Sequence, residues 1–309
     1  MSTVVLLTDD AELLAELRPA FAAVAPALRV LQAHDPGAAE AEVAACWFPP
    51  AGALQALPRL RLIHSVSAGI EHLGAAASLP PLPVCRVVDL AQRQGMVEFM
   101  RWAVIHYQRQ FDLVLARQRQ ARWQRPPQCP AGAYRVGVLG LGSMGSAVAQ
   151  DLAQAGYAVR GWSRSRKTLA GVDCYHAAAG LRDCIAGLDL LINLLPLTAA
   201  TAGLLDGPLF AALAPGAVLV NAGRGQHVAE DDLNAALATG QLRAALLDVF
   251  AQEPLPPHHP WWHTAGVTVT PHMASAASAH CIASQIAENT RRLASGQALL
   301  HRANPALGY

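Results

Sequence analysis

The stretch YRVGVLGLGSMGSAVAQDLAQAGYAVRGW, from Tyr134 to Trp162, constrains the fold more than any other part of the chain. An apolar run leads into Gly140, Gly142 and Gly145, and a helix-period segment and a second apolar run follow, in the order of a strand–helix–strand unit. The first glycine permits a tight turn, the second lets a pyrophosphate approach the backbone, and the third lets helix and strand pack closely. The helix N-terminus offers N–H groups to the phosphates. The motif therefore predicts a dinucleotide-binding domain rather than a tight turn without a ligand.

The same alternation of apolar runs and helical segments extends over most of the chain, which is typical of parallel sheets covered by helices. In the first third, the expected strands are Val4–Thr8, Arg29–Gln32, Ala45–Phe48, Leu62–Val66 and Val84–Val88. After Tyr134, six more are expected, the number in a dinucleotide fold: Arg135–Leu139, Ala158–Trp162, Leu190–Leu194, Ala217–Asn221, Ala244–Val249 and Val267–Thr270.

The length of 309 residues predicts two domains. A long helical pattern spans about 91–119, with a break near Gly95, and a loop rich in proline and glycine follows at 122–133. The last helix, about Ser275–Ala294, has no strand after it and is expected to pack on the first domain. We expect an α/β protein of two doubly wound parallel-sheet domains. A Rossmann cofactor domain (99–275) is inserted in a flavodoxin-like substrate domain (1–98 and 276–309).

Composition excludes several classes of function. The chain is 53% hydrophobic and 15% charged, with a net charge of +1, so it can form packed cores but offers no electrostatic case for a nucleic-acid or membrane partner. It has no apolar run long enough to span a bilayer, and its N-terminus lacks the features of a signal peptide. The six cysteines show no CxxC spacing and are expected to be buried thiols. We expect a cytoplasmic protein.

The turn after the second strand of the motif indicates which dinucleotide binds. A carboxylate there usually accepts a hydrogen bond from the ribose 2′-hydroxyl of NAD. This chain instead has cations and hydroxyls, at Ser163, Arg164, Ser165, Arg166 and Lys167. Because arginine and serine can bind a 2′-phosphate, the turn favours NADP(H) over NAD(H), which the protein could also accept. The alternative is a solvated basic turn.

Three polar residues follow three expected strands: Arg224, Glu253 and His272. Since ligands bind at the carboxyl ends of strands in open α/β sheets, we expect these side chains to meet at one edge. They suit reduction of a carbonyl. Histidine donates a proton near neutrality, a carboxylate on its far ring nitrogen fixes the tautomer and favours imidazolium, and arginine binds a carboxylate and polarises the adjacent carbonyl. Taken singly, each could instead be a surface contact, a solvated loop residue or a cap.

Five segments carry a resemblance to a known family: GVLGLGSMGSAVAQ, INLLPLTAATAGLL, VNAGRGQHVAEDDLNAAL, LLDVFAQEPLPPHHPWW and TPHMA. They resemble the D-isomer-specific 2-hydroxyacid dehydrogenases, and GWSRSRK, VNAGRGQHV and EPLPPHHPWW look like the glyoxylate/hydroxypyruvate reductase A branch. The resemblance implies that Arg224 binds substrate, His272 donates the proton, Glu253 is its partner, and Asp248 contacts the nicotinamide carboxamide. The motif and the resemblance together give these cofactor-binding residues: Gly140, Gly142, Ser143, Met144, Gly145, Ser163, Arg164, Ser165, Lys167, Leu195, Pro196, Thr201, Ala222, Gly223 and Asp248.

In the first domain, HSVSAGIEHL matches the family's carboxylate loop. The amides of Ala68, Gly69 and Ile70 would form a nest for an anion, although Ser67 stands where the family has glycine. Trp47 either walls the substrate pocket or packs in the core, and the Trp261–Trp262 pair is available to narrow that pocket.

These observations predict reduction of a small 2-keto acid, glyoxylate or hydroxypyruvate, by NADPH in a homodimer. The alternatives are a cofactor-sensing regulator without turnover, a dehydrogenase for another 2-keto acid, and a formate or phosphite dehydrogenase. Formate enzymes of this fold carry glutamine where this chain has Glu253. No metal is expected, since the His-rich stretch PPHHPWWH lacks the spacing of a zinc site and His258 and His259 are expected at a rim or in solvent.

Overall fold

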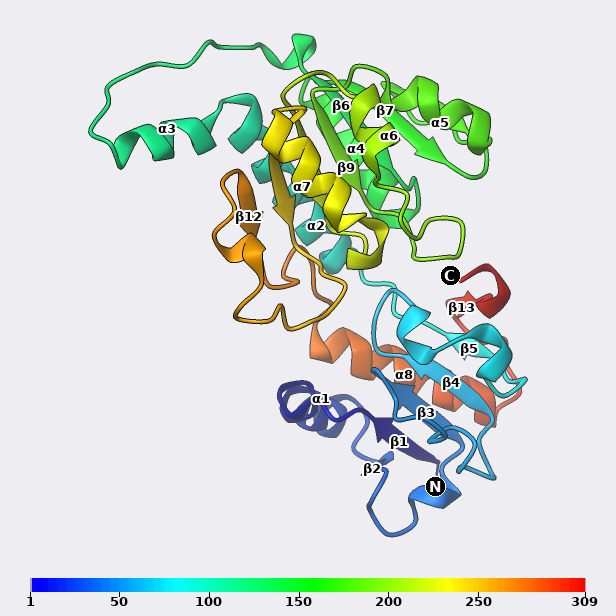
Figure 1. The fold of residues 1–309 in the computed structure, drawn as a ribbon. Coiled ribbons are helices and arrows are strands. Elements are labelled where there is room, and N and C mark those ends of the chain that lie inside the picture. The colour runs from blue at the N-terminus through cyan, green and yellow to red at the C-terminus, as the bar shows by residue number, and fades with distance from the viewer. Residues whose placement is uncertain (1, 309) are drawn as a thin grey trace. The chain divides into compact units, whose positions relative to one another are not determined.

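The computed structural model describes residues 2–308, which form two compact α/β units (Figure 1). One unit comprises residues 2–92 and 277–308, and the other comprises residues 93–276. The sequence predicted boundaries after residues 98 and 275. The structure has the first boundary after Gln92, inside a helix, and the second after Ala276.

The first unit is built on a six-stranded sheet. Its strands, in the spatial order β13-β5-β4-β3-β1-β2, are parallel except for the pair of β13 and β5. The bounds are β1 (Thr3–Leu7), β2 (Arg29–Gln32), β3 (Val43–Cys46), β4 (Leu62–Ser65), β5 (Val84–Cys85) and β13 (Arg302–Ala303). The five predicted strands are present. The prediction that no strand follows the last helix is wrong, because the two-residue β13 extends the edge of the sheet in the antiparallel sense.

Two helices cover one face of this sheet: α1 (Ala11–Val24) and α8 (Ala279–Ala294). The side chain of Asp10 caps α1 and that of Ser278 caps α8, which satisfies amides that a helix start leaves unpaired. Alternation along β1 puts Val4 and Leu6 under these helices, while Val5 and Leu7 pack with Leu54, Leu57 and Leu60 on the other face. The last helix packs on the first unit, as predicted.

The second unit contains a seven-stranded parallel sheet in the order β12-β11-β10-β9-β6-β7-β8. The strands are β6 (Arg135–Leu139), β7 (Ala158–Ser163), β8 (Val172–His176), β9 (Leu190–Asn193), β10 (Ala217–Asn221), β11 (Leu242–Leu247) and β12 (Val267–Val269). The six predicted strands are all present, but β8 was missed because its sequence, VDCYH, is half-exposed at the sheet edge and makes no apolar run. The strand order reverses at β6, so the crevice between β6 and β9 is where a dinucleotide fold binds its ligand.

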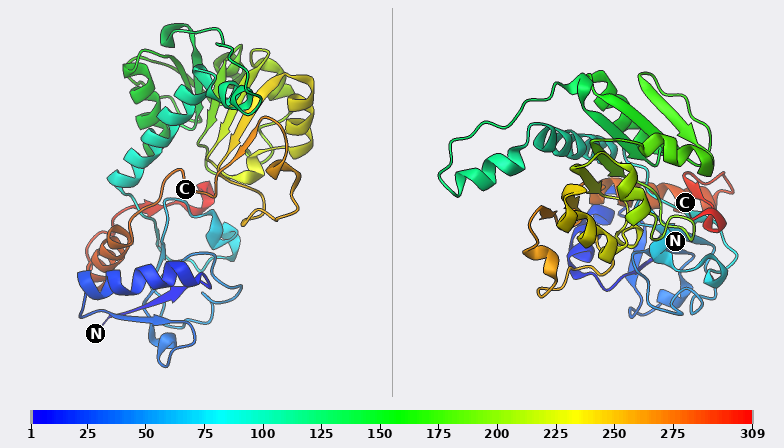
Figure 2. Two further views of the ribbon diagram at one scale, coloured as in Figure 1. Left: turned by 90° about the vertical axis from the view of Figure 1, so that its left-hand side faces the viewer. Right: turned by 45° about the horizontal axis from the view of Figure 1, so that its top comes forward.

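Helices cover both faces of this sheet (Figure 2). One face packs against α2 (Leu90–Gln108) and α4 (Ser143–Gln154), and the other against α5 (Ala177–Ile185), α6 (Gly207–Ala212) and α7 (Glu230–Thr239). The predicted break near Gly95 is wrong, since α2 runs through that glycine. The helix ends instead before Gln110, whose φ of 57° begins a separate α3 (Phe111–Gln118).

Helix α3 and the loop after it project from the body of the second unit in Figures 1 and 2. This projection and the adjoining part of α2 carry five exposed large apolar residues: Trp102, Ile105, Phe111, Leu115 and Trp123. Such a concentration is typical of a surface that another protein covers. Within residues 2–308, no helix combines the length and the apolar character needed to cross a bilayer.

Candidate active site

The turn between β6 and α4 has the geometry that its glycines predict. Gly140 has φ +97°, and a Cβ there would lie 2.6 Å from the Leu194 carbonyl oxygen. A Cβ on Gly145 would lie 1.9 Å from the Gly140 carbonyl oxygen, so only glycine lets α4 pack this closely. Gly142, the N-cap of α4, has open space around its Cβ position. The backbone at the helix start is therefore accessible to a phosphate.

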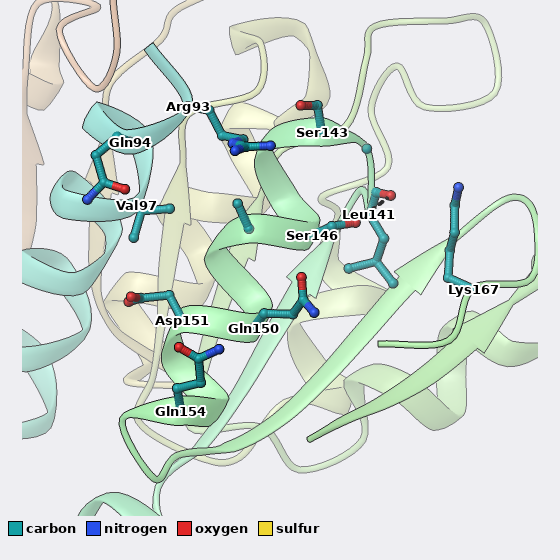
Figure 3. A pocket seen from close by; sticks show the side chains of 12 residues that line it. Arg93, Gln94, Val97, Leu141, Ser143, Ser146, Gln150, Asp151, Gln154 and Lys167 are labelled. Carbon is teal, nitrogen blue, oxygen red and sulfur yellow. Dashed lines mark hydrogen bonds between the residues drawn. The ribbon is translucent and has the colours of Figure 1, made fainter. Parts of the chain in front are cut away.

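A pocket of about 620 Å³ lies beside this turn, lined by Gly142 and Ser143 of the turn and by Arg93 and Lys167 on its two sides (Figure 3). Lys167 belongs to the basic turn after β7. In that turn Ser163 is buried and its hydroxyl donates to the Ser165 carbonyl over 2.8 Å, so it shapes the turn, whereas Arg164 and Ser165 are exposed. With cations in place of a carboxylate after β7, the residues present fit a dinucleotide with a 2′-phosphate.

Arg224, Glu253 and His272 follow the carboxyl ends of β10, β11 and β12, which are neighbours in the sheet. The structure brings His272 and Glu253 together, with His272 Nδ1 2.7 Å from Glu253 Oε2. The second carboxylate oxygen, Oε1, accepts from the Phe250 amide at 2.8 Å. The imidazole is thus tied through Nδ1, and Nε2 is the nitrogen through which it would act.

The charge on Glu253 is stabilised by its surroundings. Burial alone raises the pKa of this carboxyl, but the hydrogen bonds from His272 and the Phe250 amide and the positive charge of Arg224 outweigh burial, and the pKa lies below its ordinary value. The group is therefore a carboxylate at neutral pH. The side chains of His272 and Glu253 remain 38% and 34% exposed, so a small molecule can reach the pair.

A buried carboxylate holds the loop that carries His272. Asp248 is 1% exposed, and its Oδ1 accepts from the Thr270 hydroxyl at 2.7 Å and from the Met273 amide at 2.9 Å. Its Oδ2 accepts from the Ala274 amide, and its main-chain oxygen from the His272 amide, both at 2.9 Å. His272 has φ 51°, in the left-handed region, where a non-glycine residue is strained. Asp248 therefore fixes the backbone around His272, a function that the sequence did not predict. That Asp248 also contacts the nicotinamide carboxamide stays a prediction.

Arg224 stands at the start of a short 3₁₀ turn, Gly225–His227. Its Nη1 donates to the Gly223 carbonyl over 2.6 Å, and its main chain is bonded to Asn221 and His227 below it. The sequence pattern did not predict these two supporting residues. The only signal was a polar residue at the end of an otherwise apolar strand, AVLVN.

The other predicted residues of the cofactor cleft follow β9 and β10. Leu195 is buried, and the Thr201 hydroxyl donates to the Pro196 carbonyl over 2.7 Å, which closes the loop after β9 on itself. Ala222 and Gly223 follow β10 directly, and a Cβ on Gly223 would lie 2.7 Å from Asn193 Nδ2. These residues lie at the carboxyl ends of strands, on the side of the sheet where the phosphate turn follows β6.

In the first unit, Trp47 follows β3 and its ring contacts that of His72 in a tilted arrangement, with the ring centroids 4.8 Å apart. The loop after β4 is tied down through its carbonyls. The Gly69 oxygen accepts from the Ser65 hydroxyl at 2.7 Å, and the Ala68 oxygen accepts from Arg86 Nη1 at 3.3 Å. Ile70 is buried. That the amides of this loop bind an anion stays a prediction.

The His-rich stretch forms a packed loop. The His259 ring contacts that of Trp261 in a tilted arrangement, with the ring centroids 4.8 Å apart, and its Nε2 lies 3.6 Å from Glu230 Oε2, while His258 is exposed. Trp261 is 3% exposed, and its ring N–H donates to Asn234 Oδ1, so it is a core residue rather than a pocket wall. In the part of the chain that the structure describes, no three His, Cys, Asp or Glu residues are grouped to hold a metal ion.

Comparison with known proteins agrees with this geometry. Residues 102–274 match the family model described as D-isomer specific 2-hydroxyacid dehydrogenase, NAD binding domain. The glyoxylate/hydroxypyruvate reductase A of Serratia proteamaculans is 40% identical over 275 residues, which cover 87% of this chain and 88% of that protein.

Solved structures extend the likeness to both units. A D-isomer specific 2-hydroxyacid dehydrogenase family protein from Klebsiella pneumoniae is 46% identical, with a TM-score of 0.95 over 99% of this chain and 98% of that one. The NADPH-dependent glyoxylate/hydroxypyruvate reductase from Sinorhizobium meliloti, solved with NADP and sulfate, is 32% identical, with a TM-score of 0.92 over 100% of both chains. The chain therefore belongs to the D-isomer specific 2-hydroxyacid dehydrogenase family.

Proposed function

We propose that the protein reduces a small 2-keto acid to the 2-hydroxy acid with NADPH, and that glyoxylate and hydroxypyruvate are its best substrates. The observation that carries this proposal is the pair of His272 and Glu253, 2.7 Å apart. His272 follows β12 and Glu253 follows β11, which lies next to β10, the strand that leads to Arg224. The relatives from Serratia and Sinorhizobium are glyoxylate/hydroxypyruvate reductases, and the second is NADPH-dependent, which supports the choice of substrate and of NADPH.

The proton of the reduction is assigned to His272. Glu253 accepts a hydrogen bond from Nδ1 and fixes the orientation of the ring, which leaves Nε2–H to donate to the carbonyl oxygen that must be protonated. Arg224 binds the substrate carboxylate and polarises the carbonyl beside it. The nicotinamide, when bound, supplies the hydride. Asp248 keeps His272 in place through the loop at 270–274.

The cofactor is assigned to the crevice at the carboxyl end of β6. The amides at the start of α4, reached past Gly142, would bind the pyrophosphate. Arg164, Ser165 and Lys167 would bind the 2′-phosphate, and the lack of a carboxylate after β7 removes the repulsion that NADP(H) meets in NAD-specific sites.

The assembly is proposed to be a cytoplasmic homodimer. The exposed apolar residues of α2, α3 and the projecting loop would be covered by a second copy, since monomers rarely expose so many large apolar side chains together. All six cysteines are free, as is usual in a reducing compartment. Sedimentation equilibrium tests the dimer, and a monomer at micromolar concentration would contradict it.

The activity is tested with a substrate panel. We expect kcat/KM to be highest for glyoxylate and hydroxypyruvate among these two, pyruvate, 2-ketoisovalerate and phenylpyruvate, and to be higher with NADPH than with NADH. A best rate on phenylpyruvate would contradict the choice of substrate. The absence of nicotinamide oxidation with every member would favour a cofactor-binding protein without turnover.

A further inference from the structure

A buried histidine lies directly beneath the loop that carries Arg224. His227 is fully buried, and both of its ring nitrogens have partners. Nδ1 lies 3.1 Å from the Arg224 main-chain nitrogen and 2.9 Å from Asn193 Nδ2, and Nε2 lies 3.3 Å from the Pro196 carbonyl oxygen. An amide N–H can only donate and a carbonyl can only accept. The ring is therefore neutral, with its proton on Nε2.

Two buried asparagines extend this network. Asn193 ends β9 and Asn221 ends β10, and the Asn193 amide donates to Asn221 Oδ1 over 2.8 Å. Asn221 then holds the next loop, since its Oδ1 accepts from the Gly223 amide at 3.2 Å and its Nδ2 donates to the Arg224 carbonyl over 3.0 Å. The peptide groups on both sides of Arg224 are thus held by the buried side chains of Asn221 and His227.

The main chain at Gly223 packs so closely on the His227 ring that the ring restricts the conformation of this loop. A Cβ on Gly223 would lie 3.1 Å from His227 Nδ1, and a Cβ on Gly225 would lie 1.8 Å from the Phe250 carbonyl carbon. Backbone packed this tightly cannot shift to find another acceptor for the Arg224 amide. Loss of the ring nitrogen would leave that donor unpaired and change the loop.

We propose that His227 is a positioning residue whose two ring nitrogens hold two different loops. Nδ1 sets the Arg224 loop, which binds the keto acid, and Nε2 sets the Leu195–Pro196 loop, which lines the cofactor cleft. The inference rests on the proposed function for the identity of these ligands. On this proposal, loss of Nδ1 weakens substrate binding and loss of Nε2 weakens cofactor binding. If His227 were only a structural residue, the loss of either nitrogen would have the same effect on both.

Three substitutions separate the two nitrogens. In His227→Asn, the side-chain oxygen takes the place of Nδ1 and can still accept from the Arg224 amide. In His227→Gln, the amide nitrogen takes the place of Nε2 and can still donate to the Pro196 carbonyl. His227→Leu replaces the ring with an apolar side chain of similar bulk and removes the hydrogen bonds of both nitrogens.

We expect His227→Gln to lower kcat/KM for glyoxylate ~10-fold, through both KM and kcat because Arg224 binds the carboxylate and polarises the carbonyl, with little change in the Kd for NADPH measured by fluorescence. His227→Asn should do the reverse, weakening NADPH ~10-fold and sparing the KM. His227→Leu should show both effects. As a matched control, Gln241→Leu removes hydrogen bonds to the Phe210 and Leu213 carbonyls at the opposite end of the sheet and should change neither constant.

Hydrogen exchange measured on peptides covering residues 218–230 gives a readout that needs no turnover. Exchange at this loop should rise in His227→Gln and His227→Leu and stay near that of the unmutated protein in His227→Asn. If the Asn and Gln variants behave alike in exchange, KM and Kd, the division between the two nitrogens is wrong. If the unmutated protein reduces no keto acid but the exchange pattern holds, the proposed function fails and the positioning of the loop by Nδ1 stands.

Discussion

Substitution of Asp248 by asparagine would test how the loop that carries His272 is held. The carboxylate accepts from the Thr270 hydroxyl, the Met273 amide and the Ala274 amide at 2.7–2.9 Å, in a site that is almost fully buried. Asparagine keeps one acceptor oxygen. The asparagine amide keeps most bonds when its oxygen faces Thr270 and Met273. Its NH₂ group then faces the Ala274 amide, and because both groups are donors, that hydrogen bond is lost.

The size of the effect follows from these three bonds. A hydrogen bond to a charged group contributes about 2 kcal/mol and one to a neutral group about 1 kcal/mol. One lost bond and two weakened bonds therefore cost about 4 kcal/mol of loop stability, before any relaxation. Since His272 is held at φ 51° by this loop, we expect the ring to leave its working position most of the time. A misplacement of about 1 Å at a catalytic group can lower kcat ~100-fold.

The assay combines kcat with glyoxylate, the Kd for NADPH and the free energy of unfolding in urea. Asp189→Asn is the matched control, because Asp189 also accepts a main-chain amide, that of Arg135 at 2.8 Å, but lies before β9 at the other end of the sheet. We expect both variants to be less stable and only Asp248→Asn to lose kcat, with NADPH affinity changed less than 3-fold, well short of one lost charged hydrogen bond. Full kcat in Asp248→Asn would refute this account. A selective loss of NADPH affinity would instead favour contact with the nicotinamide.

Three further predictions concern the proposed reaction. His272→Ala should lower kcat ~100–10,000-fold, as expected for loss of a general acid, while NADPH still binds with its normal Kd by fluorescence titration; retention of more than half of kcat would rule His272 out. Glu253→Gln should lower kcat, because the His272 ring loses the carboxylate that holds its Nδ1. Folding lowers the pKa of Glu253, so the ionised carboxylate stabilises the folded protein above the ordinary carboxyl pKa, and this stabilisation is lost as the pH falls through the folded pKa. The unfolding free energies of Glu253→Gln and of the unmutated protein should therefore become equal in acid. Arg164→Ala and Lys167→Ala should each raise the KM for NADPH and leave that for NADH nearly unchanged, and equal KM values for the two cofactors before mutation would contradict the assignment.

The parts of the structure that the sequence could predict are those that obey local rules. The glycines of the β6–α4 turn are predictable because each meets a local steric demand, and the convergence of Arg224, Glu253 and His272 follows from the shared polarity of parallel strands. Strand β8 was missed because an exposed edge strand needs no apolar run. The break in the helical segment was misplaced to Gly95 because the actual break, at Gln110, has no glycine or proline to mark it.

The roles of the supporting residues could not be predicted from the sequence for a different reason. His227 and Asp248 act through partners that are distant in sequence, from Pro196 to His227 and from Asp248 to Ala274. From the sequence alone, a histidine in a loop or an aspartate after a strand is equally compatible with contacting a ligand and with supporting the backbone, and only its partners distinguish the two. The sequence therefore predicts the groups expected to face the ligands, whereas the residues that hold them are recognised only in the structure.

One physical requirement accounts for these supporting residues together. Strands β9, β10 and β11 are buried on both faces, so the loops that leave their carboxyl ends start with backbone amides that water cannot reach. A buried polar side chain at the end of β9 and of β10 meets this demand for the loop that follows the strand, and Asp248, directly after β11, meets it for the neighbouring loop after β12. Asn193 accepts from the Leu195 amide, Asn221 from the Gly223 amide, and Asp248 from the amides of the loop after β12. The same bonds that satisfy the buried backbone also fix the directions of the loops, so Arg224 and His272 are held in place before any ligand arrives.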